Sequence, residues 1–161
     1  MKNIIIKTLL FTCIFMMLAW TSAQSKRPAY VPADAVFFTG KYYKFFSAKY
    51  SWNEAEKKCR EMKGLLVSIK DKKTHKFLMK LSQGRCFWAG GSDAVTEGEW
   101  LWRDGTKITY SDWADKEPDD WKGKEDCLVL GWPGTRYENG KWADTSSIYH
   151  KQIDGYICEW K

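Results

Sequence analysis

Hydrophobic and polar residues recur along the chain with two different periods. In residues 51–62 and 72–82, apolar side chains return every three to four positions, which predicts two amphipathic helices. Ser51 and Glu54 have the spacing of a capping box at the start of the first helix. Short apolar runs predict strands at 41–46, 65–69, 99–102, 127–132, 136–142 and 155–160. Two early helices followed by a turn-rich sheet indicate an α+β domain.

The beginning of the chain has a different pattern, that of a signal peptide. Lys2 and Lys7 precede an apolar run at 8–20, and small residues up to Ala23 follow it. The run is too short to span a membrane, and no second one follows. We therefore expect a leader at 1–23, a lead-in at 24–39 and one domain at 40–161, in a secreted protein with no membrane span.

Charge changes this picture little. The formal net charge is +6, and loss of Lys2 and Lys7 with the leader lowers it to +4. Five of the lysines fall within 70–80. We interpret them as a solvated helix face rather than as a binding patch, and we expect no nucleic-acid partner.

Four cysteines remain after the leader: Cys59, Cys86, Cys127 and Cys158. An even number in an exported chain predicts two disulfides, and four cysteines allow three pairings. No two of them have C-x-x-C spacing, which argues against a redox motif and against a zinc site.

The irregular stretch at 93–126 concentrates carboxylates. Its acids include Asp93, Glu97, Asp112, Asp115, Glu117, Asp119, Asp120, Glu125 and Asp126. Crowded carboxylates raise one another's pKa unless a cation neutralises them. Oxygen ligands without His or Cys suit Ca²⁺. A solvated acidic loop is the alternative, but the neighbouring Trp113 and Trp121 make it less attractive.

Several local patterns, in this order, resemble the C-type lectin domain: KYYKFF, SWNEAEKKC, FWAGG, EPDDWKGKEDC, GKWAD and YICEWK. The resemblance covers about 40–161. It implies a double-loop fold, in which two helices flank small antiparallel sheets and a long loop binds calcium. It also implies a Cys59–Cys158 disulfide and calcium-dependent carbohydrate binding.

The resemblance also implies particular calcium ligands. The principal site would use Glu117, Asp119, Glu125 and Asp144. An auxiliary site would use Asp93, Glu97, Asp120, Glu125 and Asp126. The Glu117-Pro118 bond is expected to be cis, as only a bond before proline readily is.

The sequence departs from the family pattern at three places. The motif W-N-D reads Trp142-Ala143-Asp144, and E-P-N reads Glu117-Pro118-Asp119, so two amide donors are missing. Asp119 followed by Trp121 resembles the galactose-type motif Q-P-D-x-W, in which the indole packs on the sugar. We therefore expect galactose or N-acetylgalactosamine rather than mannose, with contacts from Glu117, Asp119, Trp121, Glu125 and Asp144. The family's partner position for Cys127 is Ser147, so we predict a Cys86–Cys127 disulfide.

Two other functions are weighed against sugar binding. The chain has two histidines and no H-E-x-x-H, G-x-S-x-G or phosphate-loop motif, so we expect no enzyme. Glu117 and Asp119 could suggest glycoside hydrolysis, but a calcium ligand is not free to donate a proton. The second alternative is a lectin-like domain that binds a protein or another surface, with calcium in a structural role.

Overall fold

The computed structural model describes residues 27–134, 140–148 and 151–161. The chain divides into two compact units, Met1–Val31 and Pro32–Lys161. In the first unit, the Val31 amide donates to the Pro28 carbonyl at 2.9 Å and closes a turn. The predicted signal peptide lies outside the described residues. No helix within those three ranges is long and apolar enough to cross a membrane.

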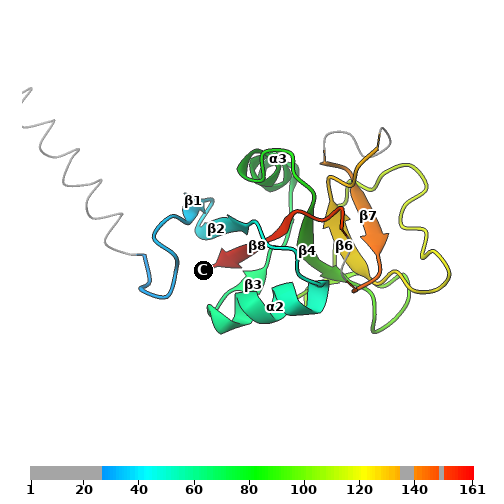
Figure 1. The fold of residues 1–161 in the computed structure, drawn as a ribbon, viewed down its shortest axis with the longest axis horizontal. Helices are drawn as coiled ribbons and strands as arrows, with labels where there is room; N and C mark the ends of the chain where they lie inside the picture. Colours follow the sequence, from blue (N-terminus) through cyan, green and yellow to red (C-terminus); the bar gives the residue numbers. More distant parts are fainter. Residues whose placement is uncertain (1–26, 135–139, 149–150) are drawn as a thin grey trace, which may run out of the picture. The chain divides into compact units, whose positions relative to one another are not determined.

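The second unit is built on one mixed sheet (Figure 1). Its main path runs β1 (Val36–Phe38), β2 (Lys41–Phe46), β8 (Gly155–Trp160), β4 (Phe87–Ser92), β6 (Cys127–Leu130) and β7 (Trp142–Thr145). Off this path, β3 (Leu65–Leu66) pairs with β8, and β5 (Leu101–Trp102) pairs with β4. All pairs are antiparallel except β4 with β8. The α+β fold class is confirmed, with a parallel pair that the sequence did not predict.

The two helices flank the sheet on opposite sides in Figure 1. Helix α2 (Trp52–Glu61) begins with the predicted capping box: the Ser51 hydroxyl accepts from the Glu54 amide, and the Glu54 carboxylate accepts from the Ser51 amide at 2.8 Å. Its buried face carries Cys59, which is bonded to Cys158 of β8 with a Cα–Cα distance of 5.5 Å. The predicted Cys59–Cys158 disulfide is confirmed.

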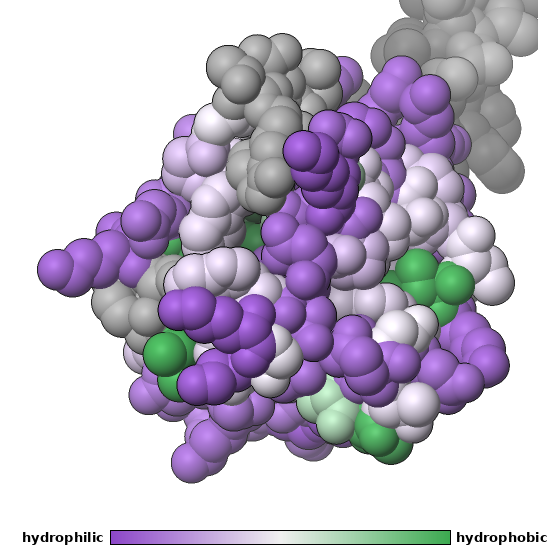
Figure 2. Space-filling view, turned by 90° about the vertical axis from the view of Figure 1, so that its right-hand side faces the viewer, coloured by the Kyte–Doolittle hydropathy of each residue, from purple (hydrophilic) through white to green (hydrophobic). Residues whose placement is uncertain are grey.

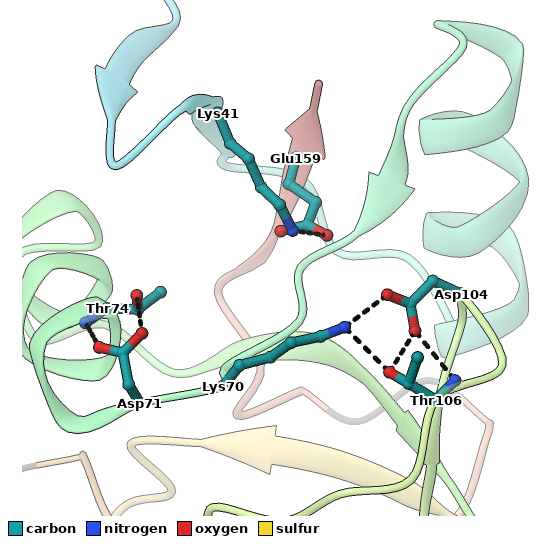
Figure 3. A network of polar contacts seen from close by, with 7 residues as sticks. All are labelled: Lys41, Lys70, Asp71, Thr74, Asp104, Thr106 and Glu159. Atoms are coloured by element: carbon teal, nitrogen blue, oxygen red, sulfur yellow. Dashed lines mark hydrogen bonds and ion pairs between the residues drawn. The ribbon is translucent and has the colours of Figure 1, made fainter.

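Helix α3 (Lys72–Leu81) begins at Asp71, whose carboxylate accepts from the Thr74 amide at 2.7 Å. Just before it, Lys70 donates to Asp104 at 2.7 Å and to Thr106 at 2.9 Å, as Figure 3 shows. This pair ties the start of α3 to the turn after β5. Figure 3 also shows the ion pair between Lys41 of β2 and the buried Glu159 of β8, at 2.8 Å.

The hydrophobic core lies where these elements meet. Its largest fully buried side chains come from five of the strands, from α3 and from the segment before β8; they include Trp88, Trp142, Trp160, Phe87, Leu66, Leu78, Leu128 and Ile153. Tryptophans therefore contribute mainly to packing. Burial is most complete on β4, β6, β7 and β8, and the first two of these strands carry the ends of the long loop.

Several predicted strands have different limits in the structure. Only Leu65–Leu66 of the predicted 65–69 is a strand, and the predicted 99–102 shrinks to Leu101–Trp102. The predicted 136–142 lies partly outside the described residues, and β7 continues to Thr145. The dipeptide Asn139-Gly140 is typical of a tight hairpin turn, and Asn139 lies outside the described residues. Strand β1 falls in the segment expected to be a lead-in.

The predicted Cys86–Cys127 disulfide is wrong. The register of β4 and β6 places Cys127 opposite Ser92, six positions after Cys86. Six residues of strand span about 20 Å, whereas a disulfide needs Cα atoms within about 7 Å. Both thiols are free and buried, and burial raises the pKa of Cys86 to about 12. Both cysteines therefore act as small apolar core residues.

Candidate functional site

The long loop at 93–126 leaves the sheet after β4 and returns at β6. Three indoles anchor it: the ring centroids of Trp100 and Trp113 are 4.9 Å apart, and those of Trp113 and Trp142 are 5.6 Å apart. The backbone of the loop also pairs with β7, because the Trp142 amide donates to the Asp112 carbonyl at 3.0 Å and the Ala114 amide donates to the Trp142 carbonyl at 2.9 Å. The loop therefore has a fixed base beside β7.

Beyond this base, the loop lies on the side of the molecule that Figure 2 shows. Hydrophilic residues dominate that side, and hydrophobic residues form small separate spots on it. The carboxylates of the loop gather into two groups among the described residues.

The first group contains Glu117, Asp119 and Asp144, which each offer an oxygen within 4.8 Å of the other two. The Glu117-Pro118 bond is cis, as the sequence predicted. Asp144 lies on β7 and is buried. Its two oxygens accept from the Asp119 amide at 3.1 Å and from the Asp120 amide at 2.9 Å. A buried strand residue thus holds the turn that presents Asp119.

Glu125 lines the same hollow of about 220 Å³ as the first group. Its carboxylate accepts from the Trp121 amide at 3.1 Å, and its own amide donates to Asp120 at 3.1 Å. The pKa of Glu125 is raised to about 7, first by burial and then by the charges of Asp144 and Asp119. Proximity to other acids therefore opposes ionisation of Glu125, and a cation in the hollow would favour it.

The second group contains Asp93, Glu97 and Asp126, again with one oxygen from each within 4.8 Å of the others. One oxygen of the buried Asp93 accepts from the Gly98 amide at 3.0 Å. The other oxygen, Oδ1, is buried and has no partner among the described residues. Burial, and to a lesser degree Asp126 and Asp144, raise the pKa of Asp93. A buried carboxylate oxygen without a donor is a position that a hard cation fits.

The structure therefore brings together six of the eight predicted ligands in two groups and places Glu125 at the first of them. Asp120 is in neither group, and its carboxylate accepts from the Glu125 amide at 3.1 Å. Both groups consist of carboxylates alone, and the donor set fits Ca²⁺ rather than a metal that prefers nitrogen or sulfur.

The aromatic rim of the first hollow has two members. Trp121 is 62% exposed and lines the hollow, and the Lys122 ammonium lies 4.0 Å from its ring centroid. Trp132, which the sequence analysis did not single out, also lines it. Its only signal in the sequence is its position at the end of the predicted strand 127–132, two residues after β6. Ala143 lines the hollow as well and is buried, so the departure from W-N-D lies at the site itself.

Comparisons with known proteins agree with this geometry. Residues 48–160 match the model of the lectin C-type domain. The low affinity immunoglobulin epsilon Fc receptor of Mus musculus is 31% identical over 128 residues, which are 80% of this chain but 36% of the receptor. The chain thus spans about a third of that relative.

Two solved structures are similar over most of the chain. The mouse scavenger receptor C-type lectin carbohydrate-recognition domain is 30% identical with a TM-score of 0.71, and the match covers 81% of this chain and 98% of that one. A Ca²⁺-dependent type II antifreeze protein, in its Ca²⁺-free form, is 26% identical with a TM-score of 0.71, and the match covers 81% and 100%.

Proposed function

The chain belongs to the lectin C-type domain family, and from this premise we propose that it binds terminal galactose-type sugars through calcium. Domains of this family are generally carbohydrate-binding and non-enzymatic, typically bind Ca²⁺, and act outside the cell. The observation that carries the proposal is the convergence of Glu117, Asp119 and Asp144 beside an exposed Trp121. The leader pattern at 1–23 supports secretion.

Each side chain at the first hollow has a role in this proposal. Ca²⁺, when bound, would accept lone pairs from two neighbouring sugar hydroxyls. Glu117, Asp119 and Glu125 would hold the ion and accept hydrogen bonds from those hydroxyls, while Asp144 keeps the 119–120 turn in position. Asp93, Glu97 and Asp126 would hold a second ion that stiffens the loop. Asp120 supports the site through its bond to the Glu125 amide.

The preference for galactose over mannose rests on Trp121. Because Asp119 and Ala143 replace two amides of the family pattern, the site has few donors with which to select a sugar by hydrogen bonding. The indole of Trp121 offers apolar area instead, since it is largely exposed even with Lys122 over one face of the ring. Galactose-type sugars have an apolar face that suits such packing.

Calorimetry tests this proposal, with Ca²⁺ titrated first and then galactose and mannose titrated into the loaded protein. We expect Trp121→Ala to weaken galactose binding about 5- to 30-fold, which corresponds to 1–2 kcal/mol of lost packing, and to leave Ca²⁺ binding unchanged. Phe37→Ala is the matched control, because Phe37 is equally exposed, at 61%, and lies on β1. Mannose binding that survives Trp121→Ala would refute the galactose assignment.

Glu117→Gln tests the same site with a change that is expected to strengthen galactose binding. This change creates the full Q-P-D-x-W pattern and returns one amide donor to the hollow. We expect galactose affinity to rise severalfold, at the level of one added hydrogen bond, while mannose affinity falls or stays the same. An equal change for both sugars would show that position 117 does not select between them.

A second candidate function is supported by Asp144 and Ala143. Both oxygens of Asp144 already accept backbone amides, and Ala143 offers no side-chain ligand. Calcium would then be structural, and the loop would bind a protein or another surface. The similar antifreeze protein, which its name describes as Ca²⁺-dependent, supports this possibility. Calcium binding without any heat from either sugar would favour this second function.

A further inference from the structure

Helix α3 presents a row of lysines that the sugar site does not use. Lys72, Lys73, Lys76 and Lys80 are all exposed. At about 100° per residue they fall within a stripe about 100° wide and about 12 Å long. In place of the solvated face expected from the sequence, we propose that this stripe, the α3 lysine face, is a second binding surface, and that it takes a linear polysaccharide carrying sulfate or carboxylate groups.

The lysines of this face lack the ion pairs that accompany the basic residues of the other helix. In α2, Lys58 pairs with Glu61 at 2.9 Å and Arg60 pairs with Glu56 at 2.5 Å. On α3, none of the four lysines makes an ion pair with any residue that the structure describes.

The acid nearest in sequence, Asp71, does not neutralise the row. Its carboxylate accepts from the amide and the hydroxyl of Thr74, at 2.7 and 2.9 Å, and so caps the helix. Like charges three and four positions apart destabilise a helix. The α3 lysine face therefore opposes folding. Lys73 lies 5.5 Å from the centroid of the Phe38 ring, but no ion pair with a described residue neutralises the row, as expected for a surface that binds an external anion.

The inner face of α3 argues for a polymer of charged sugars rather than a membrane. Thr74, His75 and Leu78 are buried against the domain, and Phe77 stacks on Phe38 of β1 with ring centroids 4.0 Å apart. No large apolar side chain of α3 is exposed, so the helix has nothing to insert into a bilayer.

The chemistry of lysine also favours a polymer of charged sugars. Lysine ammonium groups act as point charges on flexible stems and require no planar, bidentate partner. A row of them suits anionic groups repeated along a flexible chain. The α3 lysine face carries no exposed aromatic residue on which a nucleic-acid base could stack. The acidic loop at 93–126, with 11 acidic and 5 basic residues, would repel the same ligand.

Heparin is the probe, used with the full chain in excess chelator so that calcium-held sugar binding contributes nothing. Affinity is measured between 50 and 300 mM salt. For the combined variant Lys72→Gln, Lys73→Gln, Lys76→Gln and Lys80→Gln, we expect at least a tenfold loss of affinity. The slope of log affinity against log salt should shrink by about one for each lysine replaced, because a glutamine no longer releases a counterion from the polymer on binding.

A control variant separates this surface from overall charge. Lys49→Gln, Lys57→Gln, Lys107→Gln and Lys151→Gln remove the same number of exposed charges from other parts of the domain. We expect this variant to lose less than threefold in affinity. Equal losses in the two variants would overturn the proposal, because net charge alone would then explain binding.

Three further probes identify the ligand class. Desulfated heparin, vesicles containing phosphatidylserine and duplex DNA are tested at the same salt concentration. Weaker binding to all three than to heparin supports the proposal, and tighter binding to vesicles or DNA overturns it. Galactose binding with calcium should be unchanged in the α3 variant, so the failure of one proposal does not imply the failure of the other.

Discussion

His75 is a buried polar residue whose hydrogen bonds determine its protonation state. Its Nε2 lies 3.0 Å from the Gly140 carbonyl, which can only accept, so Nε2 carries the proton. Its Nδ1 then accepts from the Tyr110 hydroxyl at 3.1 Å. The pKa of His75 is lowered, because the effect of burial outweighs the opposing effects of the Gly140 bond and of Asp112. The neutral imidazole links α3 to the long loop at Tyr110 and to the segment before β7 at Gly140.

This assignment makes stability depend on pH. The folded state disfavours the imidazolium ion, whereas an unfolded histidine titrates near pH 6.5. Protons therefore bind the unfolded histidine preferentially as pH falls below about 6.5, and His75 by itself should lower the free energy of unfolding by about 1 kcal/mol at pH 5.5. Glu125, whose pKa is raised to about 7, has the opposite effect over the same pH range. The contribution of His75 is therefore measured by urea unfolding at pH 7.5 and 5.5, in excess chelator, as the difference between the parent and a variant without the imidazole.

His75→Gln provides the comparison, because its amide can still donate to Gly140 but does not titrate. The variant should be less stable than the parent at pH 7.5 and should lose less stability between the two pH values. If parent and variant lose the same amount of stability, the pH dependence arises elsewhere, for instance at the carboxylates of the loop.

The elements of the fold differ in how far the sequence predicts them. Helices α2 and α3 are predicted because each buries one face, which leaves a regular apolar spacing. Strand β1 is missed because it lies at the edge of the sheet and exposes Val36 and Phe37, so it shows no alternation. The limits of the short strands depend on pairing with distant segments, which local pattern does not record.

The candidate site is likewise predicted only in part by the sequence. The acids of the long loop are visible in the sequence, and the resemblance assigns most of them to sites that match the observed groups. The wrong Cys86–Cys127 prediction shows what the sequence does not reveal. The register between β4 and β6 decides which residues lie opposite each other, and the spacing of the cysteines along the chain does not record that register. Trp132 was missed because only folding brings it to the hollow.

The cap of α2 can be tested directly. Ser51→Ala removes the hydroxyl that accepts from the Glu54 amide, and we expect the free energy of unfolding to fall by about 1 kcal/mol. The urea midpoint should shift without a change in the slope. Ser47→Ala, at an exposed position before the helix, is the control and should have little effect. Equal effects of the two substitutions would show that the cap does not stabilise the domain.

For the domain as a whole, the dominant feature is the uneven distribution of charge. The loop at 93–126 has an excess of acids and is held to the sheet by indoles at its base and by Asp144 at its tip. Each of its two carboxylate groups brings like charges together when no cation is bound. Burial first, and then these neighbouring charges, raise the pKa values of Asp93 and Glu125. The Cys59–Cys158 bond closes the opposite part of the domain, away from this repulsion.

Calcium should therefore stabilise the whole domain and not only the loop. A ligand that binds only the folded state at 100 times its dissociation constant adds about 2.7 kcal/mol. For a domain of this size, that gain corresponds to a rise in melting temperature of about 10 °C. Calorimetric melting with excess calcium and with excess chelator measures the rise.

Asp144→Asn divides this effect between the two carboxylate groups. The variant removes one charge from the first group, so the stabilisation by calcium should fall, while the group of Asp93, Glu97 and Asp126 keeps its share. Asp112→Asn is a matched control, because Asp112 pairs with Lys141 and belongs to neither group.

If chelator left the melting temperature of the parent unchanged, these carboxylates would be solvated charge. Calcium would then drop out of the proposed function, whereas membership of the family, which rests on the whole fold, would stand.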